Sequence, residues 1–165
     1  MTNNRIRENI PPLSKSRFMS GLQCHKRLYL ECFHREMATP PNEKQQAVFD
    51  TGTEFGALAR RLFPGGLLIE EEYFRHDDAM RSTQTALANS QVSAIYEAAF
   101  GHDDVKTRID ILTRNSEGSY DMIEVKSSTR VKEEYIPDVG IQLYILNGSG
   151  IDIRRAYLGF VNKEY

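Results

Sequence analysis

Cysteine is scarce in this chain, which has only Cys24 and Cys32 among its 165 residues. Two cysteines are too few for a disulfide framework, and no second pair completes a four-cysteine zinc site. A mixed site that adds His25 and His34 fits none of the usual zinc spacings. We therefore favour two reduced thiols that are buried on helices.

The chain also lacks a long apolar run. No stretch approaches the roughly 20 apolar residues that a membrane-spanning helix needs. The opening MTNNRIRENIPPLS contains no apolar segment of the kind found in secretory signals. A hydrophobic fraction of 40% and a charged fraction of 27% are typical of a globular protein. These features predict one soluble domain, a cytoplasmic location and no membrane partner.

Neither sign of charge dominates, because 21 basic and 23 acidic residues give a formal charge of -2. This balance argues against a surface that binds phosphate over its whole extent, so any contact with nucleic acid must be local. Clustered basic residues are candidates for such contacts, and a solvated helix face is the alternative for each of them. The candidates are Lys26, Arg27, Arg60, Arg61, Arg130 and Lys132.

Apolar periodicity and turn residues predict helix, helix, strand, helix, three strands, helix and strand, in that order. One or two helices are expected at 13–36, with a bend near Gly21, and single helices at 43–63, 77–89 and 137–146. Strands are expected at 67–69, 92–100, 105–113, 120–127 and 151–161. Ser14 or Ser16 could cap the first helix, and Asn42 the second. The order predicts an α/β fold with a central mixed sheet of about four or five strands flanked by helices.

The chemistry is concentrated in two neighbouring strands. In Arg108-Ile109-Asp110-Ile111 the alternation buries the isoleucines and presents Asp110 on the other face. In Ile123-Glu124-Val125-Lys126 it sends Val125 inward and projects Glu124 and Lys126 together. The loop at 115–118 joins these strands as a hairpin, which can bring Asp110 beside Glu124.

Two adjacent carboxylates repel each other, and a divalent cation between them relieves the repulsion. Oxygen ligands of this kind suit Mg²⁺ or Mn²⁺. Lys126 could stabilise charge on a phosphate or orient the attacking water. The alternative is a solvated hairpin face whose charges only form cross-strand pairs, in an unrelated α+β domain.

Arg108-Ile109-Asp110, Glu124-Val125-Lys126 and Gln142 in the next helix together resemble the RecB-type branch of the PD-(D/E)XK nuclease superfamily. Within it the chain is most similar to the CRISPR-adaptation exonuclease and its uncharacterised relatives. The stretches LSKSRF from residue 13 and GTEFG from residue 52 add to the resemblance, which spans residues 13 to about 161.

The resemblance implies a restriction-endonuclease-like core and roles for individual residues. Asp110 and Glu124 would hold the metal with the carbonyl of Val125, and Lys126 would complete the catalytic motif. Glu97 resembles an acidic position before the catalytic aspartate, and a structural ion pair is the alternative for it. DNA contacts are expected from Gln142, Tyr144, Arg60 and Arg130.

Three positions depart from the family pattern. Many relatives carry a histidine metal ligand where this chain has Gly56, and Glu54 is the available substitute. A tyrosine expected in the catalytic helix is replaced by Leu146, with Tyr144 nearby. Relatives often bind a [4Fe-4S] cluster, for which Cys24 matches the first ligand, but the remaining cysteines would have to lie beyond Tyr165.

The expected function is metal-dependent hydrolysis of DNA phosphodiester bonds, exonuclease-like, on single strands or duplex ends. The alternative is a catalytically inactive module with the nuclease fold that binds nucleic acid or a protein. One nuclease-like domain is expected over residues 1–165, with a helical N-terminal part at 1–63 and a sheet-containing catalytic core at 64–165. The chain could be a fragment of a longer protein.

Overall fold

The computed structural model describes residues 11–164. The sequence-based expectations for the opening residues 1–10, and for Tyr165, lie outside this range. No helix within it is both long enough and apolar enough to cross a membrane.

A mixed sheet forms the middle of the molecule, with strand order β2-β3-β4-β5-β6 and β1 paired to β4 outside this path. β2 runs parallel to β3 and β5 runs parallel to β6, whereas β4 runs antiparallel to both of its neighbours, β3 and β5. The strands are β1 (Leu13–Ser14), β2 (Gly66–Leu68), β3 (Ala94–His102), β4 (Val105–Arg114), β5 (Tyr120–Lys126) and β6 (Ile153–Phe160).

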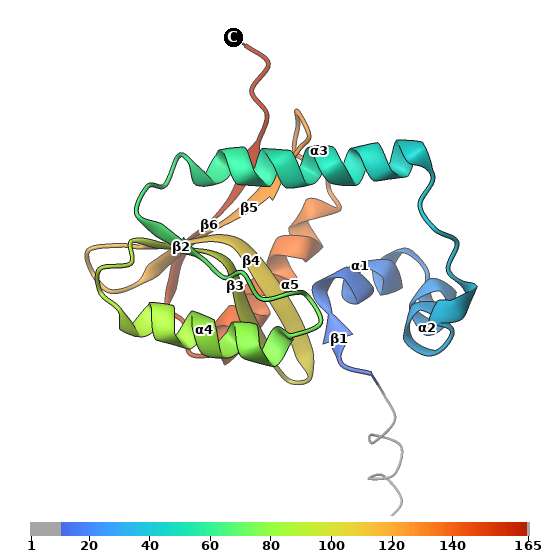
Figure 1. Cartoon of the computed structure of the whole chain (residues 1–165), viewed down its shortest axis with the longest axis horizontal. Coiled ribbons are helices and arrows are strands. Elements are labelled where there is room, and N and C mark those ends of the chain that lie inside the picture. The colour runs from blue at the N-terminus through green and yellow to red at the C-terminus, as the bar shows by residue number, and fades with distance from the viewer. Residues whose placement is uncertain (1–10, 165) are drawn as a thin grey trace, which may run out of the picture.

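Helices cover both faces of this sheet (Figure 1). α4 and α5 pack on one face, and α3 lies across the other. α1, α2 and a short 3₁₀ turn, η2, form a separate group beside β1. The helical segments are α1 (Lys15–Gln23), α2 (His25–Phe33), η2 (Arg35–Met37), α3 (Glu43–Arg60), α4 (His76–Ala88) and α5 (Tyr135–Gly148).

Local capping residues explain where the helices begin. The Ser14 hydroxyl accepts a hydrogen bond from the backbone N–H of Arg17, which caps α1 as expected. Asn42 and Gln45 form a reciprocal capping box at the start of α3. The first helical region forms two helices, one of the two expected outcomes, and it breaks at Cys24, whose backbone is extended, rather than near Gly21.

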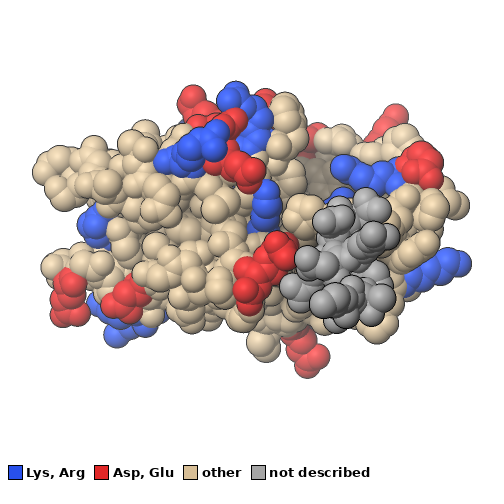
Figure 2. Space-filling view, turned by 90° about the horizontal axis from the view of Figure 1, so that it is seen from below, with Lys and Arg blue, Asp and Glu red and all other residues tan. Residues whose placement is uncertain are grey.

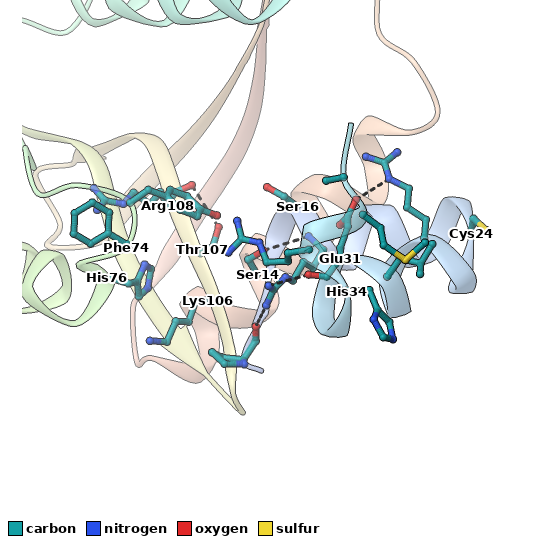
Figure 3. A pocket seen from close by; sticks show the side chains of 18 of the residues that line it. Ser14, Ser16, Cys24, Glu31, His34, Phe74, His76, Lys106, Thr107 and Arg108 are labelled. Carbon is teal, nitrogen blue, oxygen red and sulfur yellow. Dashed lines mark hydrogen bonds and ion pairs between the residues drawn. The ribbon is translucent and has the colours of Figure 1, made fainter. Parts of the chain in front are cut away.

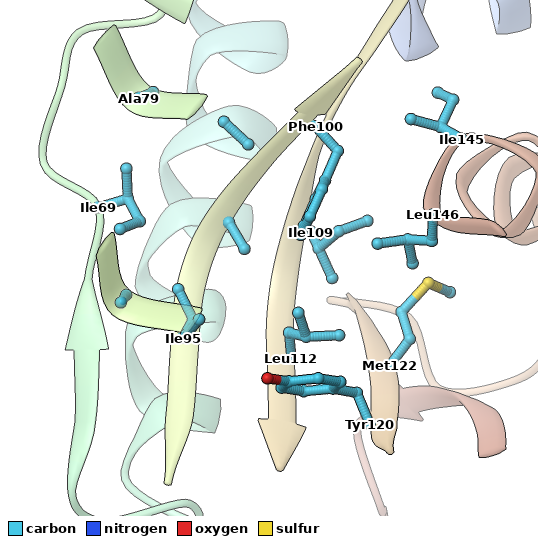
Figure 4. Close-up of a cluster of buried hydrophobic side chains, with 13 residues drawn as sticks. Ile69, Ala79, Ile95, Phe100, Ile109, Leu112, Tyr120, Met122, Ile145 and Leu146 are labelled. Carbon is cyan, nitrogen blue, oxygen red and sulfur yellow. The ribbon is translucent and has the colours of Figure 1, made fainter. Parts of the chain in front are cut away.

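The main core lies between the sheet and the helix pair α4 and α5 (Figure 4). Figure 4 shows Ala79 of α4 at one end of this cluster and Leu146 of α5 at the other. A smaller cluster on the opposite face joins Ile111 and Ile123 to Phe63, just beyond α3. β4 supplies buried residues to both clusters, so it is covered on both faces.

Tight turns set the register of the central hairpins. Asp103 and Asp104 connect β3 to β4 with positive φ angles of 48° and 59°, the conformation of the hairpin turns that match strand twist. Gly118, with φ of 84°, allows the chain to return into β5. Asp110 and Glu124 are consequently held on neighbouring strands.

The structure confirms the order of the long elements and the α/β class with a mixed sheet flanked by helices. The described residues contain six strands rather than four or five. The strand that sequence analysis missed is β1, which comprises only Leu13 and Ser14 and pairs with Val105 and Lys106. Two residues are too short for an alternating pattern to be recognised.

Candidate active site

The hairpin of β4 and β5 brings Asp110 beside Glu124. The ladder pairs Leu112 with Met122 and Ile111 with Ile123, and one further step in this register places Asp110 opposite Glu124. There the carboxylate replaces a backbone partner, because Asp110 Oδ2 accepts a hydrogen bond of 2.7 Å from the backbone N–H of Val125. The side chain of Asp110 is therefore held by the next strand.

Glu124 is buried, with 2% of its surface exposed. Its Oε1 accepts hydrogen bonds from Lys126 Nζ at 2.7 Å and from Lys15 Nζ at 2.9 Å. Its Oε2 accepts one from Gln142 Nε2 at 2.8 Å. A solvated hairpin face, the alternative raised by the sequence, does not describe Glu124, since both carboxylate oxygens are bonded to protein groups.

Two of the residues around Glu124 were missed by sequence analysis. Lys15, the first residue of α1, lies 2.9 Å from Glu124 and 3.5 Å from Asp138. Asp138, in the first turn of α5, is buried and accepts a hydrogen bond from Lys126 Nζ. One signal could have identified Asp138, because it precedes Gln142 by four residues in an otherwise apolar helix.

The side chains of Lys15, Asp110, Glu124, Lys126 and Asp138 form what we call the charge cluster. It contains three carboxylates and two ammonium groups, so one negative charge is not matched by a lysine. Burying an unmatched charge is unfavourable. Either protonation of one carboxylate or binding of an additional cation would remove the excess negative charge.

The pKa values of Asp110 and Glu124 are shifted in opposite directions within this cluster. Burial, followed by repulsion from Glu124, raises the pKa of Asp110 to about 7. Burial also opposes ionisation of Glu124, but attraction to Lys15 and then to Lys126 outweighs it and lowers the pKa of Glu124. Burial works against the charge of Lys126 too, yet Glu124 and Asp138 raise its pKa, so it is a cation near neutral pH.

This set of donors fits a hard divalent cation. Asp110 and Glu124 supply oxygen ligands from adjacent strands, and Asp110 is difficult to ionise unless a positive charge joins it. The ammonium of Lys15 already occupies a position between Glu124 and Asp138. Within residues 11–164 no three His, Cys, Asp or Glu side chains converge as a ready ligand group. Mg²⁺ is commonly bound by one or two carboxylates and retains water, which suits this arrangement.

Glu97 lies at the register position opposite Asp110, between the pairs Tyr96 with Ile111 and Ala98 with Ile109. Its φ of 55° falls in the left-handed region that residues other than glycine rarely adopt. Such local strain is concentrated at functional sites. The carboxylate accepts a hydrogen bond of 2.7 Å from Arg60 of α3.

Glu97 therefore forms the structural ion pair that was one alternative from the sequence, and it also lines a cleft, while its role in a metal site stays a prediction. We call this cavity of about 800 Å³ the Asp110 cleft. Asp110, Glu124 and Glu97 line it from the sheet, and α3 lines the opposite side. The α3 residues that line it are Val48, Phe49, Gly52, Thr53, Gly56 and Arg60.

Gly56 faces this cleft, and no heavy atom lies within 4 Å of the position that a Cβ would take. Space for a histidine ligand is therefore present, although the residue is absent. Glu54, the substitute suggested by the sequence, is exposed and is not among the residues that line the cleft.

Four predicted catalytic or DNA-binding residues do not line the cleft: Lys126 and Gln142, which contact Glu124 instead, and Tyr144 and Arg130. The Tyr144 hydroxyl donates a hydrogen bond of 2.6 Å to Asp103 in the turn between β3 and β4. Arg130 is exposed in the loop after β5. Leu146 is completely buried in the main core, so a tyrosine at this position would point into the core.

The expectation of two buried helix cysteines is wrong: Cys24 is an exposed free thiol at the junction of α1 and α2, and Cys32 is only partly buried. The mixed site that would add His25 and His34 is not formed, because the part of the chain that the structure describes contains no such ligand group.

No family model matches the chain, and no curated protein matches it at significant similarity.

Proposed function

We propose that the protein is a metal-dependent deoxyribonuclease with a restriction-endonuclease-like core, acting as an exonuclease in the cytoplasm. The observation that carries this proposal is the carboxylate pair of partly buried Asp110 and buried Glu124, on adjacent strands, with Lys126 hydrogen-bonded to Glu124. The single negative charge that the lysines leave unmatched supports a cation as the missing component.

Asp110 and Glu124, with the carbonyl of Val125, would hold Mg²⁺ or Mn²⁺. When bound, the cation would lower the pKa of a water molecule and neutralise charge on a phosphate. A [4Fe-4S] cluster at Cys24 remains a proposal that requires cysteines beyond Tyr165.

Lys126 has an electrostatic role in this proposal. Its raised pKa means that its ammonium keeps its proton near neutral pH, so it does not act as a general base. It can donate hydrogen bonds to a phosphate oxygen as negative charge develops during hydrolysis. Asp138 and Glu124 hold the ammonium in place, and Gln142 fixes the second oxygen of Glu124.

The Asp110 cleft offers a surface for the substrate as well. Val48 and Phe49 of α3 are apolar side chains with 65% and 60% of their surfaces exposed. They line the same cleft as the carboxylates, where they can pack against sugars or bases. Arg60 is bonded to Glu97 and lies within reach of the same cavity.

A catalytically inactive nuclease-fold module is the second candidate. It is favoured by the glycine at position 56 and by the ammonium of Lys15, which already compensates Glu124 and Asp138. In that case the cleft would bind nucleic acid or a protein without cleaving a bond.

Cleavage of labelled single- and double-stranded DNA in the presence of Mn²⁺ tests the proposal. The wild type is expected to degrade DNA, and Lys126→Ala is expected to be at least about 100-fold slower, the order found when one transition-state donor is removed. Asp110→Ala is expected to abolish Mn²⁺ binding measured by calorimetry. Equal rates for the wild type and Lys126→Ala would refute the catalytic assignment, and a wild type that binds DNA without cleaving it would favour the inactive module.

A further inference from the structure

A second cavity, of about 1080 Å³, separates the N-terminal helices from the sheet. Figure 3 shows its two walls: Cys24, Glu31 and His34 belong to the side formed by α1 and α2, whereas Lys106 and Arg108 belong to β4. We call this cavity the basic groove. Its position is distinct from the Asp110 cleft, although the two cavities share residues.

The lining of the basic groove is strongly positive. Among residues 11–164, six basic residues and a single acidic residue, Glu31, line it. The whole chain carries a formal charge of -2. The face seen in Figure 2 carries blue and red side chains in small mixed groups, with no extended field of one sign. The positive lining is therefore a local concentration, and its basic residues are Arg17, Lys26, Arg27, Arg35, Lys106 and Arg108.

Most of this charge is not neutralised by carboxylates. Arg17 and Arg108 donate their hydrogen bonds to backbone carbonyl oxygens, which carry no full charge. Lys26 and Arg35 are exposed and form no ion pair with any residue of the described range 11–164. Among the residues that the structure describes, two of the six have a carboxylate partner, in the pairs of Arg27 with Glu31 and of Lys106 with Asp77.

Two exposed aromatic rings complete the groove. Tyr73 and Phe74 lie between β2 and α4 and leave 64% and 83% of their surfaces exposed. Rings this exposed gain little from packing in the folded chain, whereas nucleobases can stack on them. Alternation of cationic groups with aromatic rings is typical of grooves that bind single-stranded nucleic acid.

The basic groove adjoins the Asp110 cleft. Tyr73 and Ser16 line both cavities, so these two side chains lie at the boundary between them. Lys15 of the charge cluster is the neighbour of Ser16 in the chain. A ligand in the groove would therefore lie next to the candidate active site.

We propose that the basic groove binds one strand of nucleic acid, with phosphates along Lys26, Arg35 and Lys106 and with bases stacked on Phe74 and Tyr73. The strand continues past Tyr73 into the Asp110 cleft. This inference rests on the proposed nuclease function, for which it supplies the substrate path and a preference for single strands. A duplex cannot stack its paired bases on protruding rings without being opened.

Binding of a fluorescein-labelled oligothymidylate of about 16 nucleotides, an upper site size for one single-strand-binding module, tests this path. Fluorescence anisotropy of the full chain in EDTA measures affinity without cleavage. The double variant Lys26→Glu with Arg35→Glu is expected to bind at least tenfold more weakly. Its slope of log affinity against log salt should fall by about 1.4, or roughly 0.7 for each lost phosphate contact.

Phe74→Ala tests the stacking part of the proposal. It is expected to weaken single-strand binding by about tenfold, the order of one lost base stack, and to leave the salt dependence unchanged. Binding of a blunt duplex of the same length should change much less. Equal losses for single strand and duplex would overturn the stacking assignment.

Lys44→Glu with Lys163→Glu is the matched control, since it changes the net charge equally at exposed residues that line neither cavity. This control should bind like the wild type, and melting temperatures should show that all variants are folded. An equal loss of affinity in the control would overturn the groove proposal, because the effect would then come from the net charge of the protein. A wild type that binds no oligonucleotide would overturn it in favour of a protein ligand.

Binding and cleavage by the same variants distinguish failure of the groove proposal from failure of the nuclease proposal. If the wild type binds single strands through the groove but never cleaves them with Mn²⁺, the groove is supported and the nuclease assignment fails. If Mn²⁺-dependent cleavage is present and the groove variants bind and cleave like the wild type, the nuclease assignment stands and the groove is refuted.

Discussion

Asp110 and Glu124 are chemically similar residues in the same buried site, yet their neighbours move their pKa values in opposite directions. Glu124 touches two ammonium groups, whereas Asp110 accepts one backbone hydrogen bond and faces Glu124. The pair therefore holds its remaining proton on Asp110 near neutral pH. A cation that binds between these carboxylates must displace that proton.

Mn²⁺ binding is accordingly expected to weaken as the pH falls below about 7, the raised pKa of Asp110, and to level off above it. Calorimetric titrations at about pH 6 and about pH 8 measure this change, and proton release on binding should be larger at the lower pH. Equal affinities at the two values would contradict the prediction.

Protonation of Asp110 should also affect the stability of the metal-free protein, but here a rise in pH is unfavourable. The folded state keeps a proton on Asp110 up to about 7, whereas the unfolded chain releases it near 3.8, so this group makes unfolding easier as the pH rises between these values. Asp110→Asn should lack this decline.

Glu124 affects stability in the acid range instead. Because its pKa is lowered in the folded state, stability is lost as the pH falls below about 4.5.

Among the elements, α3 has an unusual position because it forms one side of the Asp110 cleft and has no fully buried residue. The sequence predicted its start well, since the capping box of Asn42 and Gln45 depends only on residues close in the chain. Its two glycines, Gly52 and Gly56, lower helix stability but leave open space above the cleft.

Gly56→His is expected to strengthen Mn²⁺ binding by about tenfold or more, because it places an imidazole in open space beside Asp110 and Glu124. Calorimetry of the variant and the wild type measures the change. Gly140→His is the matched control, because Gly140 is an exposed helical glycine with equally open surroundings on α5 and does not line the cleft. The same gain in both variants would indicate binding outside the proposed site.

The molecule as a whole depends on the sheet being covered on both faces. α4 and α5 bury one face, α3 buries part of the other, and β4 contributes to both clusters. The charge cluster lies where α1, α5 and the sheet meet, so its geometry depends on how these layers pack together.

Leu146→Ala is expected to lower the free energy of unfolding by about 2–5 kcal/mol, because it opens a cavity between α5 and the sheet at a completely buried position. Leu62→Ala removes the same atoms from a side chain with 77% of its surface exposed and should change stability by less than about 0.5 kcal/mol. Denaturant unfolding measures both. Similar losses would show that Leu146 is not a core residue.

Short-range patterns in the sequence were sufficient for the order of the long elements, the capped start of α3 and the hairpin that sets Asp110 beside Glu124. Each depends on residues that are neighbours in the chain or are joined by one short loop. Lys15 could not be assigned in this way, and neither could the backbone conformation of Glu97. Lys15 reaches Glu124 across 109 residues, and the left-handed backbone of Glu97 is held among β4 and α3. Contacts between distant segments form only when the layers pack against each other. The tertiary fold therefore determines the positions of these two residues, and local sequence preferences do not.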